Sequence, residues 1–98
     1  MYKQLFTINH FMAGALGGVL SERREETIKK YPLLENQLKE IGKVEVNYAG
    51  DRVALQSFPE TIIVTSEHED IRNGFERIVL SLNISGLYEP IGDLTRED

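Results

Sequence analysis

The residues best suited to chemistry in this sequence surround a glycine-rich stretch near its start. Three glycines lie within the apolar run 11–20, and a serine and two arginines follow directly. Backbone amides of a glycine-rich loop, together with the start of the next helix, form a common site for an anion. The candidate ligand-binding residues are therefore His10, Gly14, Gly17, Gly18, Ser21, Arg23 and Arg24, and the expected ligand is a phosphate or a nucleotide-like molecule.

Three interpretations of residues 11–20 remain open. In the first, a helix runs from about His10 and buries Met12, Leu16 and either Val19 or Leu20, while its glycines let another element approach closely. In the second, the stretch is the anion-binding loop, and in the third it is a mobile flap. The stretch has neither the GxGxxG pattern nor the Gly-Lys-Ser/Thr ending of a P-loop, so no known nucleotide motif decides between them.

Other reactive residue types are sparse. The chain has no cysteine, and its two histidines have no metal-binding or catalytic spacing around them. The acidic residues that follow Ser66 are explained by helix capping, with Glu69 completing a capping box. We therefore predict no catalytic residue, no metal ligand and no cofactor, and an enzyme is the less favoured class.

Composition limits the kinds of partner. The chain has 98 residues and a net charge of −5, which suits one acidic domain and disfavours non-specific binding to a nucleic-acid backbone. Residues 11–20 are too few to cross a bilayer, and no signal-like segment precedes them. We expect a cytoplasmic protein without a membrane contact.

The clearest structural pattern lies between Val44 and Thr65. Apolar residues alternate along 44–48, Gly50-Asp51 suits a hairpin turn, and Phe58–Thr61 suits a second turn. These signals predict an antiparallel meander of three strands, in which Ile63 faces away from the main apolar face. Residues 2–8 predict a further strand inside the sheet, because apolar residues occur on both of its faces.

The remaining segments predict helices and a tail. We expect helices over 21–30 and 32–41, separated near Tyr31 because Pro32 interrupts the pattern, with Gly42 ending the second. The capping box at Ser66 predicts a helix that continues to about Asn83. The polar residues 87–98 predict a tail with scattered apolar residues, so the domain covers 1–94 and residues 95–98 fray.

The elements together predict an α+β fold: a two-layer sandwich in the order β-α-α-β-β-β-α, with the helices on one face of the sheet. The function we expect is a small, acidic, non-catalytic binding module that occupies a partner protein or a second copy of itself. An inhibitor of the kind made by viruses or mobile elements is one form of such a module. The candidate interface residues are Phe11, Met12, Leu16, Ile63, Tyr88 and Ile91. The alternative is an oligomeric small-molecule binder that captures a nucleotide-like or phosphate ligand at residues 14–18 and the following helix start.

Overall fold

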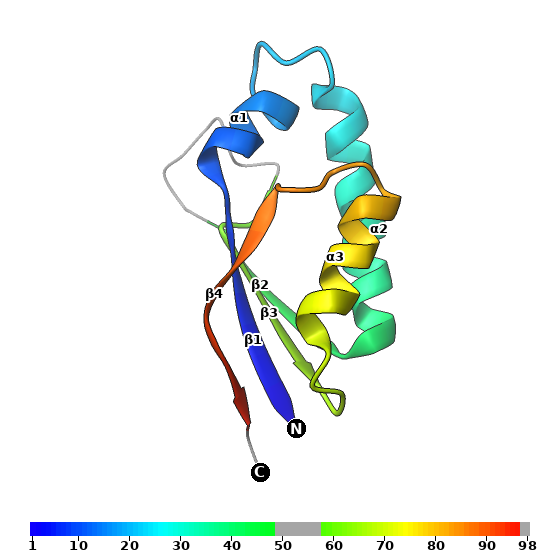
Figure 1. Cartoon of the computed structure of the whole chain (residues 1–98). Helices are drawn as coiled ribbons and strands as arrows, with labels where there is room; N and C mark the ends of the chain where they lie inside the picture. Colours follow the sequence, from blue (N-terminus) through cyan, green and yellow to red (C-terminus); the bar gives the residue numbers. More distant parts are fainter. Residues whose placement is uncertain (49–57, 97–98) are drawn as a thin grey trace.

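The computed structural model describes residues 1–48 and 58–96, which form four strands and three helices. The elements are, in chain order, β1 (Tyr2–Ile8), α1 (His10–Gly17), α2 (Arg24–Ile41), β2 (Lys43–Asn47), β3 (Thr61–Ser66), α3 (Ile71–Ser81) and β4 (Tyr88–Arg96). The strands form one antiparallel sheet in the order β2-β3-β1-β4. Helices α2 and α3 lie side by side on one face of this sheet, and α1 continues from the end of β1 (Figure 1). The predicted α+β class, with an antiparallel sheet and helices on one face, is confirmed.

Strand β1 occupies the centre of the sheet, as its two-sided apolar pattern predicts. It pairs with β3 on one side and with β4 on the other. Phe6 and Ile8 point into the core beneath the helices, and Leu5 points to the opposite face. The period of two along this strand therefore indicates correctly which residues face the helices.

The pairing of β2 differs from the predicted meander. Strand β2 pairs directly with β3, so that Val44 lies opposite Val64 and Val46 opposite Ile62. A meander would place a strand between these two and would make them parallel. The predicted middle strand and its hairpin turn fall on 49–57, which lie outside the described residues.

The predicted polar tail is wrong over residues 88–96, which form strand β4. Thr95 and Arg96 pair with Lys3 and Tyr2, so these two residues do not fray; residues 97–98 lie outside the described part of the chain. The described elements therefore follow the order β-α-α-β-β-α-β. With its first helical segment divided into α1 and α2, this is the β-α-β-β-α-β arrangement called ferredoxin-like.

Helix α2 is continuous where a break at Tyr31 was expected. Pro32 lies inside it and is exposed to solvent. Proline removes one backbone donor from a helix interior, but the buried residues on the opposite side of α2 hold both halves against the core. These residues are Thr27, Tyr31, Leu34 and Leu38.

Helix α3 begins at Ile71, five residues after the predicted cap. Ser66 is the last residue of β3, and its Oγ accepts the backbone N–H of His68 at 3.1 Å and donates to the carbonyl of Ile41 at 2.6 Å. The capping-box pattern thus marks a turn that joins β3 to α3, and the helix cap itself is Asp70. The predicted apolar stripe of α3 is confirmed, with Ile71, Phe75 and Val79 buried.

The core lies between the sheet and helices α2 and α3. At its centre the rings of Phe6 and Phe75 are stacked, with their centroids 3.9 Å apart. Phe75 also meets the ring of Tyr88 edge to face, so β1, α3 and β4 share one aromatic cluster. None of the helices in the described ranges is both long enough and apolar enough to cross a bilayer.

Candidate functional site

The glycine-rich segment folds as helix α1 over residues 10–17, which agrees with the first of its three interpretations. Asn9 caps the helix by accepting the backbone N–H of Met12 at 3.2 Å. Gly17 is buried, and a Cβ at this position would collide with the ring of Phe58. The amide of Gly18 is bonded to the carbonyl of Gly14 at 3.2 Å. Close packing therefore explains the glycine at 17.

The serine and the two arginines after α1 donate to backbone carbonyls. Ser21 Oγ bonds to the carbonyl of Ala15 at 3.0 Å, and Arg24 bonds to that of Gly17 at 2.8 Å. Arg23 bonds to the carbonyl of Asn83 at 3.0 Å. These bonds satisfy acceptors at the end of α1 and after α3. Anion capture by this segment stays a prediction.

His10 has a partner that the sequence does not reveal. Its Nε2 lies 3.2 Å from Oε1 of Glu60, which precedes β3. The other carboxylate oxygen of Glu60 is buried and has no hydrogen-bond partner among residues 1–48 and 58–96. Fifty positions separate the two residues in the chain, so no local motif could have paired them.

Two buried tyrosines lie in the same part of the molecule. The hydroxyl of Tyr88 donates to the carbonyl of Pro59 at 2.6 Å, whereas the buried hydroxyl of Tyr31 has no partner in the part of the chain that the structure describes. Burial raises the pKa of both hydroxyls, and neighbouring acidic groups raise each further. Both tyrosines are therefore neutral at physiological pH and do not act as bases there.

The face of the sheet opposite the helices, which we call the open face, carries an apolar row across three strands. Ile63 of β3 lies beside Leu5 of β1, and Leu5 lies beside Ile91 of β4. Glu45 of β2 extends this row at its other end. No described helix or strand packs against the open face (Figure 1), and Ile91 is 47% exposed. Two of the predicted interface residues, Ile63 and Ile91, are thus brought together with Leu5.

The rows on either side of the apolar row are polar. One side presents Lys43, Thr65, Lys3 and Thr95, and the other presents Asn47, Thr61, Thr7 and Glu89. Among the paired residues of these rows and the apolar row, two lysines and two glutamates occur, whose formal charges cancel, whereas the whole chain has a net charge of −5.

The other predicted interface residues are not part of the open face. Leu16 and Tyr88 are buried in the core, and Met12 packs against it. Phe11 is exposed on α1, and the exposed pair Val19 and Leu20 follows that helix. Val19 and Leu20 were expected to offer a buried side chain, but α1 ends before them.

Comparison with known proteins identifies no relative. No protein-family model, no curated protein and no solved structure matches this chain. The described residues contain no group of three or more histidine, aspartate or glutamate side chains placed to hold a metal ion. The ferredoxin-like arrangement alone does not indicate an activity, because function depends on the site and not on the fold.

Proposed function

We propose that this protein is a small non-catalytic binding module that recognises a partner protein through the open face of its sheet. The observation that supports the proposal is the row of Leu5, Ile63 and Ile91, which comes from three strands and forms one apolar strip. Ile91 is exposed, and Leu5 and Ile63 are half-buried. An apolar patch on the surface of a folded domain commonly marks an interaction site. The apolar face of a sheet can pack against a second sheet.

The charged residues beside the apolar strip indicate which charges a partner surface should carry. Lys3 and Lys43 lie on one side of the apolar strip, and Glu89 lies on the other. A complementary protein surface has an apolar centre, an acidic group toward the lysines and a basic group toward Glu89. An inhibitor that covers such a surface is one form of this function. The proposal includes a cytoplasmic place of action, since a chain without cysteine suits a reducing compartment.

Photo-crosslinking tests this function. A photoreactive amino acid replaces Ile91 in one variant and Leu33, on the outer side of α2, in another; the two positions are 47% and 49% exposed. We expect the probe at 91 to capture one discrete protein in cells, and an added Ile63→Glu change to abolish the capture. The probe at 33 is the matched control and should capture no such species.

Two outcomes would count against the proposal. Equal capture from both positions, or capture that survives Ile63→Glu, would show that the open face is not the binding surface. A crosslinked product of twice the protein's own mass would identify the partner as a second copy, and sedimentation of the Ile63→Glu variant as a monomer would then confirm the surface.

A further inference from the structure

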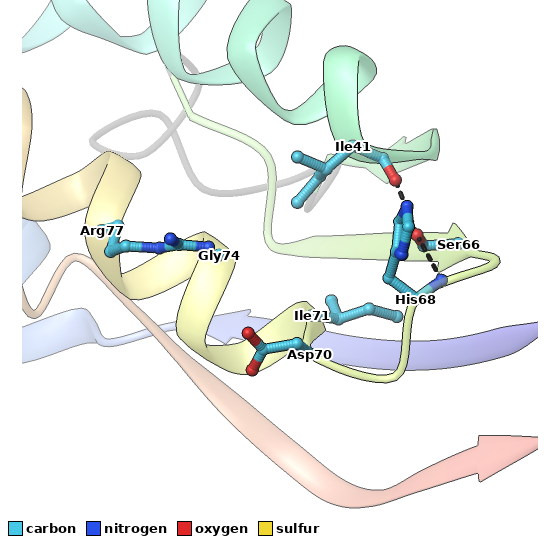
Figure 2. A pocket seen from close by; sticks show the side chains of 7 residues that line it. All are labelled: Ile41, Ser66, His68, Asp70, Ile71, Gly74 and Arg77. Atoms are coloured by element: carbon cyan, nitrogen blue, oxygen red, sulfur yellow. Dashed lines mark hydrogen bonds between the residues drawn. The ribbon is translucent and has the colours of Figure 1, made fainter.

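A cavity of about 230 Å³ lies on the helical side of the molecule, away from the open face. It opens where the end of α2, the end of β3 and the first turns of α3 meet (Figure 2). Its apolar lining comes from Ile41, Ile71 and Gly74, and its polar lining includes His68, Asp70 and Arg77. An apolar cavity of about 150 Å³ is enough to hold a benzene molecule. This cavity therefore has room for one ring with a short arm.

Gly74 contributes to the open volume of the cavity. It lies inside α3, where glycine costs about 1 kcal/mol relative to alanine. Outside the backbone of α3 itself, a Cβ at this position would meet only Cδ1 of Ile41, at 3.3 Å, among the described residues. Close approach of another main chain therefore does not explain this glycine. A side chain here would instead narrow the cavity.

The polar groups around the cavity leave hydrogen-bond donors in excess. The carboxylate of Asp70 already accepts the side-chain amide of Asn73 at 2.7 Å. The guanidinium of Arg77 makes no ion pair or hydrogen bond within residues 1–48 and 58–96, and neither does the ring of His68. Figure 2 shows Asp70 at the start of α3 and Arg77 further along the same helix, and both residues line the cavity.

These donors suit a carboxylate. The planar guanidinium of Arg77 matches the two oxygens of a carboxylate group. No side chain caps the N-terminus of α3, which adds a positive potential beside the cavity. The nearby carboxylate of Asp70 disfavours a multiply charged group such as phosphate.

We infer that this cavity binds a monocarboxylate whose apolar body is about the size of one ring. The apolar body contacts Ile41 and Ile71 above Gly74, and the carboxylate bonds to Arg77. Two sources share this chemistry: a free aromatic or branched aliphatic acid, and the C-terminal residue of a peptide. The inference does not depend on the function proposed for the open face.

Backbone amide NMR tests the inference with two acids. 3-Phenylpropionate represents the free acid and N-acetyl-phenylalanine represents a peptide C-terminus; the amide of each is the uncharged control. We expect saturable shifts at residues 66–77 with at least one acid, and binding of its amide about tenfold weaker, because a hydrogen bond to a charged group is lost. The tighter of the two acids identifies the source.

Three variants locate the site. Gly74→Ala should still fold, because the added Cβ meets only the end of the Ile41 side chain, and should lose binding. Arg77→Gln should weaken binding about tenfold. Lys29→Gln is the control: it removes one positive charge from α2 about 18 Å along the helix from Ile41. Equal binding of acid and amide, unchanged binding by Gly74→Ala, or no saturable shift at millimolar concentrations would overturn the inference.

Discussion

Arg72 of α3 donates from Nε to the side-chain carbonyl of Gln4 at 3.0 Å, within the core side of the sheet. Gln4 is completely buried, and the pairing of β1 with β4 shifts in register between Lys3 and Leu5, where Gln4 lies. The amide of Gln4 lies 3.3 Å from the carbonyls of Ile91 and Gly92 in β4, and Arg72 donates to the carbonyl of Gly92 at 2.6 Å. The two side chains thus supply hydrogen bonds where the ladder is irregular.

Replacing Gln4 with leucine should therefore destabilise the protein. The change removes the hydrogen bonds from the Gln4 amide to the carbonyls of Ile91 and Gly92, and it removes the acceptor of Arg72 Nε. Because Arg72 keeps its bond to Gly92, we expect the free energy of unfolding to fall by about 1–3 kcal/mol. Urea denaturation measures this loss. Arg72→Met should cost less alone, and the double variant should cost less than the sum of the two. Fully additive effects would show that the two residues act independently.

Substitution by alanine should lower the stability of the protein at Gly42 and raise it at Gly14. A Cβ on Gly42 would collide with the carbonyl oxygen of Thr65, whereas a Cβ on Gly14 would have no atom within 4 Å. We expect Gly42→Ala to cost about 1–3 kcal/mol through overpacking, and Gly14→Ala to add up to about 1 kcal/mol by favouring the helix. Thermal unfolding of both variants measures the contrast. A Gly42→Ala protein as stable as the wild type would contradict this packing.

The sequence pattern predicted most of the residues that face the core, but it did not predict the edge strand β4. Strands β1 and β3 alternate strictly, so their core residues could be predicted from the period of two. Strand β4 could not, because it contains Pro90 and Gly92 and only Tyr88 in it is fully buried. An edge strand can form without a regular alternation of apolar and polar residues. Tertiary contacts decide that β4 pairs with β1. The glycine at 42 was predicted correctly as a helix end, but its φ of 177° is extended, so close packing and not a left-handed turn requires it.

The candidate interaction surface could be predicted only in part, because it also depends on how the strands pair. Ile63 could be placed on the open face by alternation alone. Its neighbours Leu5 and Ile91 come from β1 and β4, and the register of both pairs is needed to show that they form one row. The pairing of His10 with Glu60 likewise depends on the return of the chain to the start of α1.

The two buried tyrosines form a matched pair for a stability measurement. Tyr88→Phe removes a hydrogen bond to the carbonyl of Pro59 and should cost about 1–2 kcal/mol. Tyr31→Phe removes a buried hydroxyl that has no partner among the described residues, so it should leave stability unchanged or increase it by up to about 1 kcal/mol. Urea denaturation at neutral pH compares them. Equal losses of stability from both changes would contradict the finding that only the Tyr88 hydroxyl is hydrogen-bonded within the described residues.

The same tyrosines should make the protein sensitive to alkaline pH. Burial raises the pKa of Tyr31 and Tyr88 in the folded state, while tyrosines of the unfolded chain titrate near pH 10. Above about pH 10 the unfolded state therefore holds fewer protons than the folded state, and stability falls by up to about 1.4 kcal/mol per pH unit for each tyrosine. Unfolding measured between neutral pH and pH 11 should show this fall. Each Phe variant should reduce its slope, and an unchanged slope in both would contradict the assignment.

A substitution at Arg24 distinguishes a structural role of this residue from a role in binding an anion. Its guanidinium bonds to the carbonyl of Gly17 at the end of α1, where a positive charge also favours the helix dipole. We expect Arg24→Gln to lower the free energy of unfolding by about 0.5–1.5 kcal/mol, and by the same amount with and without inorganic phosphate. Lys29→Gln on the exposed side of α2 is the control and should stay within about 0.5 kcal/mol of the wild type. If phosphate instead raises the melting temperature of the wild type but not of Arg24→Gln, the arginine holds an anion, and the binding site expected from the glycine-rich stretch gains direct support.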